Sequence, residues 1–456
     1  MTEHKFKNKK ILVVGMGRSG MAAVRVLNDA GAAVSVQDSK TEEKIDEEFA
    51  DYVRKSDIKC YFGVNPSAEE TYDTVVISPG VPPDLKFVDL AKEKGAEIIG
   101  ELELAYRMCR GKFVAITGTN GKTTTTTLVG EIFKNQKRDT VVAGNIGRAV
   151  ITDAVKASED TWMVTEVSSF QLETVRDFRP VVAAMLNLTP DHMNRHKTME
   201  NYGRTKARIF MNQKKKEYAV LNFDDGECFS YASSTKATIV PFSRIEELKF
   251  GAYVKDETIV IKDHDGKLIK FCGTDELKIP GAHNLENALA AVAISYFAGI
   301  DPEVITKTLK TFEGVEHRIE FCGEWNGIKF VNDSKGTNTD AAVKAIEAIS
   351  GGIVLIAGGY DKGSEFDDLI AAFGSKVKHA VLMGQTAAKI KQAAEKAGFD
   401  RTTIVKDMED CIEEACRLAE HGDTVLLSPA CASWDMYDDF EQRGRHFKEC
   451  VRKLEK

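Results

Sequence analysis

A strand, a glycine turn and a helix follow one another directly in the sequence, and this stretch constrains the fold more than any other. Apolar residues 113–116 predict a buried strand, which breaks at Gly118-Thr-Asn-Gly121, and Lys122 then opens a helix-forming segment. Such a turn holds a polyphosphate, because its glycines let backbone N–H groups approach the phosphates, the helix N-terminus adds positive potential, and the lysine offsets negative charge. The hydroxyl of Thr123 is placed to bind Mg²⁺.

The spacing of this turn is shorter than the usual phosphate-loop pattern. Ile116 stands where G-x-x-x-x-G-K-[ST] has its first glycine, so only G-x-x-G-K-T is present. An ordinary glycine turn ahead of a helix is therefore the alternative to a nucleotide site.

Composition bounds the class of protein. The chain has 456 residues, enough for about three domains. Its net charge of −8 argues against nucleic-acid and membrane-surface partners, and no apolar run approaches the ~20 residues of a membrane span. Its nine cysteines lack C-x-x-C spacing and fit free thiols in a reducing compartment. We expect a cytoplasmic, multidomain α/β protein with no nucleic-acid or membrane partner.

A second glycine motif lies near the N-terminus. Gly15-Met-Gly17-Arg-Ser-Gly20 follows a strand, and the next strand ends at Asp38, which is the arrangement of a dinucleotide site. Taken alone it favours an NAD(P)-dependent oxidoreductase. Only one further clear strand, at residues 74–77, follows within residues 1–100, so we expect a half-size fold that binds one nucleotide diphosphate, as in a nucleotide-sugar pocket.

Three strands of the central region end at polar side chains. These are Asn145, Glu166 and the turn Asp191-His192. Because ligands gather at the carboxyl ends of strands in an open parallel sheet, we expect these side chains to converge near the glycine loop. His192 and His196 also have the i, i+4 spacing of a zinc hydrolase, but the glutamate of H-E-x-x-H is missing. A histidine bonded to backbone in a turn is the other alternative.

Lys206 falls on the apolar side of the helix predicted at residues 202–210. Such a lysine usually extends to solvent. Arg204 and Arg208 flank it, and neighbouring cations disfavour its charged form. A neutral amine can react with CO₂ to give a carbamate, which is a metal ligand.

The last third of the chain alternates strands with helices and predicts another parallel sheet. Arg318, Lys335 and Lys362 fall at strand or loop ends, where they suit carboxylates or phosphates. We expect an α/β fold of three domains: a Rossmann-like half-domain over 1–100, a central P-loop ATPase-like parallel sheet with a small β addition over 101–313, and a C-terminal Rossmann-like domain over 314–456.

Taken together, these motifs resemble the Mur ligase family of ATP-dependent amide ligases. The resemblance rests on Gly118–Thr124, Glu166-Val-Ser-Ser, Asp191-His192, Lys206, His283-Asn-x-x-Asn287, His317-Arg318, Asn332-Asp-Ser-Lys335, the N-terminal glycine motif, Ser78-Pro-Gly80 and Ser428 to Gly444. It is strongest to the branch that adds D-glutamate to UDP-N-acetylmuramoyl-L-alanine through an acyl phosphate, a step of peptidoglycan precursor synthesis. It implies ATP and two Mg²⁺ ions, and we expect a monomer.

The resemblance also implies roles for individual residues. Lys122, Glu166, His192 and Lys206 would be catalytic. One Mg²⁺ would be held by Thr123 and Glu166, and the other by His192 and a carbamylated Lys206. The residues implied to bind ATP are Gly118, Thr119, Asn120, Gly121, Lys122, Thr123, Thr124, Asn287, His317, Arg318 and Asp333.

The two remaining substrates are assigned to the outer domains by the same resemblance. Residues implied for the uridine nucleotide substrate are Arg18, Ser19, Asp38, Ser39, Lys40, Ser78, Gly80 and Asn145. Residues implied for D-glutamate are Lys335, Thr337, Lys362, Ser433 and Phe440. The alternatives are a relative that adds L-alanine, a diamino acid or a dipeptide, a folylpolyglutamate synthetase, and a non-catalytic nucleotide-binding switch.

Overall fold

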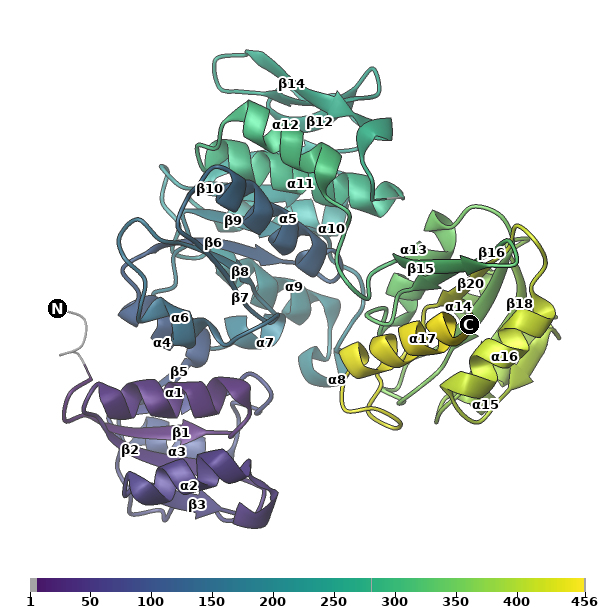
Figure 1. The fold of residues 1–456 in the computed structure, drawn as a ribbon. Coiled ribbons are helices and arrows are strands. Elements are labelled where there is room, and N and C mark those ends of the chain that lie inside the picture. The colour runs from purple at the N-terminus through teal and green to yellow at the C-terminus, as the bar shows by residue number, and fades with distance from the viewer. Residues whose placement is uncertain (1–5, 280, 455–456) are drawn as a thin grey trace. The chain divides into compact units, whose positions relative to one another are not determined.

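The computed structural model describes residues 6–279 and 281–454, which contain three β-sheets (Figure 1). The chain divides into two compact units. The first comprises residues 1–188, 196–273 and 287–309, and the second comprises residues 189–195, 274–286 and 310–456. The parallel-dominated α/β class predicted from the sequence is confirmed, whereas the boundaries at residues 100 and 313 stay predictions.

The N-terminal sheet is entirely parallel, with the order β3-β2-β1-β4-β5. Its strands are β1 (Lys10–Val14), β2 (Ala33–Asp38), β3 (Lys59–Phe62), β4 (Thr74–Ile77) and β5 (Glu97–Gly100). The helices of this part are α1 (Arg18–Asp29), α2 (Glu47–Lys55) and α3 (Lys86–Glu93).

The expectation of only one further strand after Asp38 was wrong, because β3 and β5 were missed. Both strands have four residues and lie at the two edges of the sheet. A partly exposed edge strand does not need the continuous apolar run that marks a central strand such as β4, which is buried at every position.

The central sheet has nine strands in the order β14-β13-β12-β11-β10-β9-β6-β8-β7. Pairing is parallel from β7 to β12 and antiparallel from β12 to β14, so the small β addition predicted for this region extends the same sheet. The strands are β6 (Lys112–Thr117), β7 (Thr140–Gly144), β8 (Trp162–Glu166), β9 (Val182–Met185), β10 (Tyr218–Asn222), β11 (Thr238–Ser243), β12 (Gly251–Lys255), β13 (Thr258–Lys262) and β14 (Leu268–Gly273).

Helices of the central part connect these strands (Figure 1). They are α4 (Glu101–Met108), α5 (Lys122–Asn135), α6 (Val150–Ala154), α7 (Ser169–Leu172), α9 (Met199–Ala207), α10 (Gly226–Ser230), α11 (Ala282–Phe297) and α12 (Pro302–Thr311). The short α8 (Met193–His196) belongs largely to the second unit, which takes residues 189–195. The helices predicted after the glycine loop and around Lys206 are therefore confirmed.

The third sheet has the order β15-β16-β20-β17-β18-β19, and only the β15–β16 hairpin is antiparallel. Its strands are β15 (Glu320–Trp325), β16 (Ile328–Asn332), β17 (Ile353–Ala357), β18 (Val377–Leu382), β19 (Thr402–Ile404) and β20 (Thr424–Leu427). Two hydrophobic clusters, one on each face, join the strands to α13 (Thr339–Ala348), α14 (Asp367–Ala371) and α15 (Ala387–Lys396), and to α16 (Met408–Leu418) and α17 (Phe440–Leu454).

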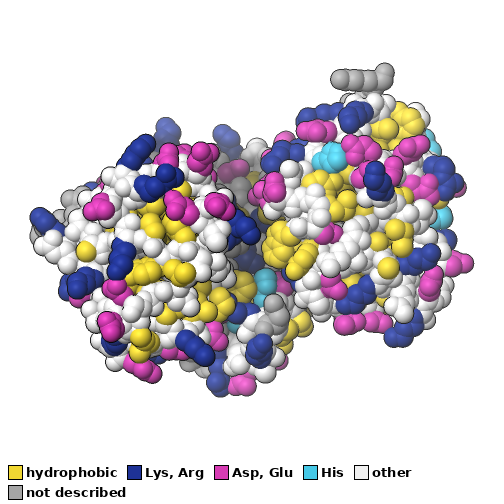
Figure 2. Space-filling model, turned by 90° about the horizontal axis from the view of Figure 1, so that it is seen from below, with side chains coloured by type: hydrophobic (Ala, Val, Ile, Leu, Met, Phe, Trp, Pro, Cys, Tyr) yellow, Lys and Arg dark blue, Asp and Glu magenta, His cyan; other side chains and the backbone are white. Residues whose placement is uncertain are grey.

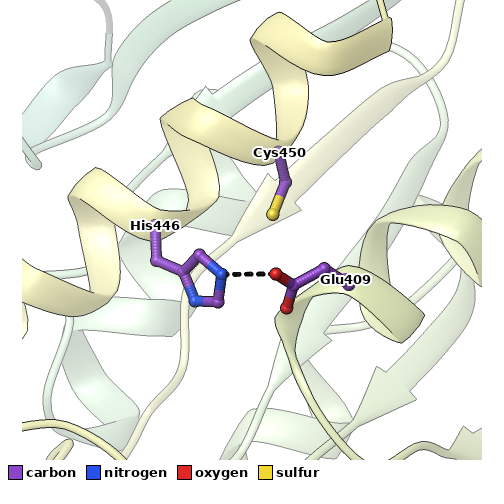
Figure 3. A group of neighbouring side chains, drawn as sticks. All are labelled: Glu409, His446 and Cys450. Carbon is purple, nitrogen blue, oxygen red and sulfur yellow. Dashed lines mark hydrogen bonds and ion pairs between the residues drawn. The ribbon is translucent and has the colours of Figure 1, made fainter.

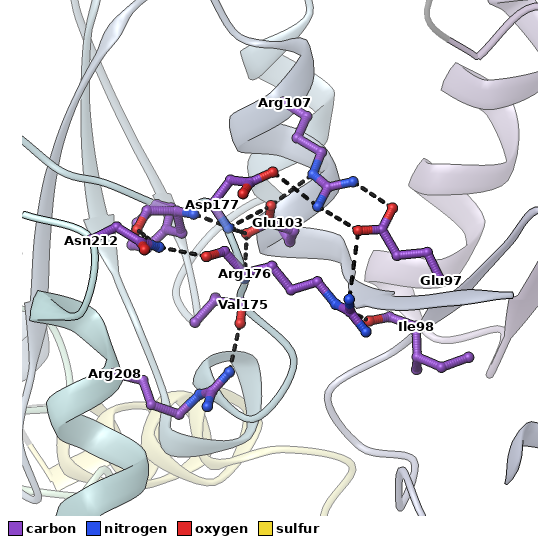
Figure 4. Close-up of polar contacts among 10 residues, drawn as sticks. Glu97, Ile98, Glu103, Arg107, Val175, Arg176, Asp177, Arg208 and Asn212 are labelled. Atoms are coloured by element: carbon purple, nitrogen blue, oxygen red, sulfur yellow. Dashed lines mark hydrogen bonds and ion pairs between the residues drawn. The ribbon is translucent and has the colours of Figure 1, made fainter. Parts of the chain in front are cut away.

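A buried ionic network ties the last N-terminal strand to the central part (Figure 4). Glu103 on α4 is fully buried and accepts hydrogen bonds from the backbone N–H groups of residues 176, 177 and 178. Arg107 donates to Glu103 at 2.7 Å and, through both Nη atoms, to Glu97 of β5 at 2.7 and 2.8 Å. One carboxylate thus organises three segments of the first unit.

The surface carries mixed charge. Figure 2 shows lysine and arginine side chains interspersed with aspartate and glutamate side chains over the face in view. All nine cysteines are free thiols, as predicted. Across residues 6–279 and 281–454, no helix combines the length and apolar character needed to cross a membrane.

Candidate active site

The phosphate-loop candidate connects β6 to α5 and requires two of its glycines. Gly118 has φ +149° and Gly121 has φ +82°, both in the region that side chains rarely adopt. A Cβ atom at Gly121 would lie 2.1 Å from Oδ1 of Asn287. The loop therefore packs against Asn287 too closely for any residue but glycine, and this is one of the contacts that brings Asn287 to the site.

Two lysines converge on this loop. Nζ of Lys122 donates to the carbonyl oxygens of Gly118 and Thr119 at 3.0 and 2.7 Å. Nζ of Lys206 donates to the same Gly118 oxygen at 2.7 Å and lies 4.6 Å from the ring centroid of Tyr202. Lys206 is only 1% exposed, so its ammonium group does not extend to solvent. Two cationic side chains thus lie at the loop expected to hold polyphosphate.

Side chains with oxygen atoms that can bind a metal ion lie at the carboxyl ends of neighbouring strands. The hydroxyl of Thr123 donates to Oε2 of Glu166 at 2.7 Å, and the amide of Asn145 donates to Oε1 of the same carboxylate at 2.8 Å. The predicted convergence of Asn145 and Glu166 near the glycine loop is therefore confirmed. The hydroxyl and carboxylate oxygens of Thr123 and Glu166 are the donor type that Mg²⁺ prefers, so this pair fits one magnesium ion.

A cavity of about 850 Å³ lies over the N-terminal glycine motif. This cavity is lined by all eight residues predicted for the uridine nucleotide: Arg18, Ser19, Asp38, Ser39, Lys40, Ser78, Gly80 and Asn145. The structure brings this set together, while the ligand itself stays a prediction.

The glycine turn of this cavity is held by side chains from two other strands. The hydroxyl of Ser78 donates to the carbonyl oxygen of Gly15 at 2.6 Å. Oδ2 of Asp38 accepts from the backbone N–H of Met16 at 2.6 Å, so this carboxylate shapes the turn as well as lining the cavity. A Cβ atom at Gly20 would lie 1.9 Å from the Gly15 oxygen, which explains the glycine at that position.

Sequence reasoning missed several residues of the cavity wall. Gln37, Asn65, Phe87 and Gly147 line it as well. The amide of Gln37 donates to Oδ1 of Asn65 at 3.4 Å and to the carbonyl of Val64 at 3.2 Å. Asn65 follows β3, so recognising that edge strand is the signal that would have found it.

The two histidines considered as a zinc pair have different environments. His196 is 6% exposed, with Nε2 2.9 Å from the hydroxyl of Ser169 and its ring 5.7 and 5.0 Å from the rings of Phe170 and Tyr202. These contacts give His196 a packing role in the first unit, which argues against the zinc-hydrolase alternative. His192 belongs to the second unit, where its Nε2 lies 3.5 Å from a carboxylate oxygen of Asp191.

Three further residues predicted for ATP also belong to the second unit. His317 is 2% exposed, and its Nδ1 lies 2.9 Å from the amide nitrogen of Asn332. Asp333 accepts a hydrogen bond from the Ser428 hydroxyl at 2.7 Å. Burial raises the pKa of Asp333 to about 6, against the opposing effect of the Arg318 charge.

Four residues predicted for D-glutamate, Lys335, Thr337, Lys362 and Ser433, fall in loops of the third sheet, and Phe440 is the first residue of α17. Nζ of Lys335 lies 4.9 Å from the ring centroid of Phe440, and the backbone N–H of Thr337 donates to the Lys335 carbonyl at 2.9 Å. Nζ of Lys362 lies 3.9 Å from Oδ1 of Asp191.

Arg443 organises this region and was missed as a site residue. It is 1% exposed and donates to the carbonyl oxygens of Ser334 at 2.8 Å and Cys431 at 3.2 Å. The guanidinium thereby joins the loop that carries Lys335 to the loop that carries Ser433. Arg443 falls within the stretch from Ser428 to Gly444 that supports the family resemblance, but the resemblance implied no role for it.

Comparison with known proteins identifies the family. The N-terminal domain of the Mur ligase MurD-like type matches residues 9–100, the Mur ligase middle domain matches residues 116–295, and the Mur ligase glutamate ligase domain matches residues 317–431. A UDP-N-acetylmuramoylalanine–D-glutamate ligase of Thermoanaerobacter sp. (strain X514) is 50% identical over 451 residues, which is 98% of this chain and 99% of the relative. The chain belongs to the Mur ligase family.

Other Mur ligases share the sequence or the fold. Enzymes of the same name from Alkaliphilus oremlandii and Clostridioides difficile are 51% and 49% identical, and each match covers 98% of this chain and 99% of the relative. Among solved structures, the UDP-N-acetylmuramate-alanine ligase of Thermotoga maritima matches with a TM-score of 0.61 at 20% identity, covering 98% of this chain and 99% of that one. The predicted three-domain α/β fold is therefore that of the Mur ligases.

Proposed function

We propose that this Mur ligase uses ATP to join the carboxylate of UDP-N-acetylmuramoyl-L-alanine to the amine of D-glutamate, a step of peptidoglycan precursor synthesis. The proposal rests on sequence identity. Over 98% of the chain, about half of the residues are identical to those of relatives named for this reaction. We further propose that it acts as a cytoplasmic monomer.

The arrangement of the first unit supports the placing of two substrates. The uridine nucleotide would occupy the 850 Å³ cavity beside the N-terminal glycine motif. The ATP phosphates would lie on the Gly118–Gly121 loop, where backbone N–H groups and the start of α5 favour anions. Asn145 lines the cavity and also bonds to Glu166, so one amide would connect the nucleotide-sugar site to the metal site.

A carboxylate is a poor acyl donor, and phosphorylation by ATP would make it a good one. The amine of D-glutamate then attacks the acyl phosphate, and phosphate leaves through a tetrahedral intermediate. Two Mg²⁺ ions, one on Thr123 and Glu166 and one on His192 and a carbamylated Lys206, would supply charge neutralisation during phosphoryl transfer. Lys122, whose ammonium group lies on the loop carbonyls, would add positive charge at the same phosphates.

Carbamylation of Lys206 is supported by burial beside the loop. The ammonium group would first lose one proton, and the neutral amine would then add to CO₂ and lose a second. These steps convert a cationic hydrogen-bond donor into an anionic pair of oxygens. The present bond from Nζ to the Gly118 carbonyl holds the nitrogen within 2.7 Å of the loop. The change would therefore replace a cation by metal-binding oxygens at a fixed place.

The second unit supplies cations for the incoming amino acid. Lys335 and Lys362 would bind the carboxylates of D-glutamate, with Thr337, Ser433 and Phe440 completing the site. Arg443 would act on this site through the backbone, because it bonds to the loops that carry Lys335 and Ser433.

Phosphate release from ATP tests the proposal. The assay contains Mg²⁺ and UDP-N-acetylmuramoyl-L-alanine, and compares D-glutamate with L-glutamate, a diamino acid and a dipeptide; a parallel reaction pairs UDP-N-acetylmuramate with L-alanine. We expect release only with D-glutamate. Release with another amino acid would assign the chain to a different branch of the family, and no release with any of them would overturn the ligase proposal.

A further inference from the structure

Three potential metal ligands meet on one face of the third sheet, outside the residues assigned to the reaction (Figure 3). Glu409 lies in the first turn of α16, and His446 and Cys450 lie four residues apart on α17. Residues at i and i+4 share a helix face. Both helices pack against the same hydrophobic cluster, which fixes the carboxylate opposite the imidazole and the thiol.

The donor atoms are close enough to share one ion. Nε2 of His446 lies 2.9 Å from Oε1 of Glu409, and these atoms and the Cys450 sulfur all lie within 4.8 Å of one another. Ligand atoms around a tetrahedral zinc ion are roughly 3.3–3.8 Å apart, given bond lengths of about 2.0–2.3 Å. Displacements of the three ligand atoms by about an ångström, through side-chain rotation, would therefore place them at the separations of a tetrahedral zinc site.

The other ring nitrogen of His446 already has a partner. Its Nδ1 lies 2.9 Å from the hydroxyl oxygen of Tyr437. Histidine ligands usually make such an outer hydrogen bond, because it orients the ring and fixes the proton on the nitrogen that does not bind metal. A simple ion pair between Glu409 and His446 does not require the Tyr437 hydroxyl on the other ring nitrogen. It also does not require the Cys450 sulfur one helical turn away.

We propose that Glu409, His446 and Cys450 form a binding site for a thiophilic divalent cation of the Zn²⁺ type, with Tyr437 as the outer partner of the histidine. Thiolate and imidazole ligands disfavour Mg²⁺, so the site is separate in chemistry from the magnesium sites of the ligase reaction. On binding, the Cys450 thiol releases its proton to solvent, and the ring proton of His446 resides on Nδ1. The ion clamps α16 to α17, the helix that begins at Phe440.

Lys453 and protons compete with the cation for the ligand atoms of this site. Nζ of Lys453 lies 3.9 Å from Oε1 of Glu409 and gives way when the ion binds that oxygen. Cys450 is 4% exposed, and its sulfur would bind a cation as the thiolate, after losing its proton. Metal binding therefore weakens as pH falls, because the proton competes with the cation for the sulfur.

Cobalt titration of the full-length, chelator-treated protein tests the proposal. A thiolate ligand gives Co²⁺ an intense near-ultraviolet charge-transfer band, and tetrahedral coordination gives visible bands. We expect both in the wild type, displaced by Zn²⁺ but not by a large excess of Mg²⁺. Cys450→Ser should abolish the charge-transfer band, whereas the control Cys416→Ser, a half-buried cysteine on α16, should retain it.

Two further variants keep the test decisive if Cys450→Ser folds poorly. Glu409→Gln should weaken Co²⁺ binding at least about tenfold by removing a ligand, and Tyr437→Phe should weaken it about 10–100-fold by removing the outer hydrogen bond. A second cluster, Glu316, His317 and Glu320, has no sulfur and cannot produce the charge-transfer band. Absence of that band in the wild type, or its persistence in Cys450→Ser, would overturn the proposal.

Discussion

Replacing Glu103 by glutamine tests whether one buried carboxylate organises the first unit. Its two oxygens accept from Nε of Arg107 at 2.7 Å and from the N–H groups of residues 176, 177 and 178 at 2.9–3.1 Å. Every one of these partners is a donor. The new NH₂ group would therefore face a donor at whichever oxygen position it took, and Arg107 would keep only the more exposed carboxylates of Glu97 and Asp177 as counterions.

The structure sets the size of the effect. Glu103 is 0% exposed and the Arg107 side chain is 8% exposed, so the pair is buried. Arg107 keeps Glu97 as a counterion, so the loss comes from buried donors that would face the new NH₂ group. Each such donor costs about 1–3 kcal/mol, and the charged guanidinium more, which gives a loss of about 3 kcal/mol. With a urea slope of about 3 kcal/mol per molar, the unfolding midpoint should fall by about 1 M.

Glu97→Gln is the matched control. This carboxylate binds the same guanidinium, but its side chain is 34% exposed. Solvent screening reduces the expected loss to about 1 kcal/mol or less, and the midpoint should fall by about 0.3 M. Urea unfolding followed by circular dichroism measures both variants. Equal midpoints for Glu103→Gln and Glu97→Gln would refute the assignment of Glu103 as the organising residue.

Three other predictions follow from single contacts. Gly121→Ala puts a Cβ atom 2.1 Å from Asn287 Oδ1, so we expect the KM for ATP to rise about tenfold or more in steady-state assays; an unchanged KM would contradict the packing argument. Gly20→Ala puts a Cβ atom 1.9 Å from the Gly15 oxygen, and calorimetry should show that the variant binds the nucleotide sugar about tenfold more weakly. Equal affinity of the variant and the wild type would contradict this prediction. Burial raises the pKa of Glu101 from 4.5 to about 7, so its contribution to stability is full below pH 4.5 and is lost as pH rises to 7. The loss should be about 3 kcal/mol, and urea titrations across this range should show a flatter pH profile for Glu101→Gln; an unchanged profile would disprove the argument.

Features that depend on local pattern could be predicted from the sequence. The strand, turn and helix around Gly118 were predicted because residues 113–133 change from an apolar run to a glycine turn and then to a helical segment. The convergence of Asn145 and Glu166 followed from one rule, that parallel strands end at the same edge of a sheet. The place of Lys206 on the apolar side of its helix could also be predicted, but its burial could not, because such a lysine usually extends to solvent.

Features that depend on partners distant in sequence could not be predicted. Arg443 bonds to a loop that is 109 residues away, and Glu103 binds backbone groups 73–75 residues away. Nothing in the neighbouring sequence of either residue indicates those contacts. His192 and His196 share one short segment, yet only packing against Ser169 and Tyr202 gives His196 a structural role.

Transfer of ¹⁸O tests the central claim most directly. UDP-N-acetylmuramoyl-L-alanine labelled with ¹⁸O in its terminal carboxylate is incubated with the enzyme, ATP, Mg²⁺ and D-glutamate, and the released phosphate is analysed by mass spectrometry. The acyl-phosphate account predicts one ¹⁸O atom in each phosphate, a stoichiometric amide product, and neither with L-glutamate. Unlabelled phosphate, or equal turnover of the two glutamate isomers, would contradict it.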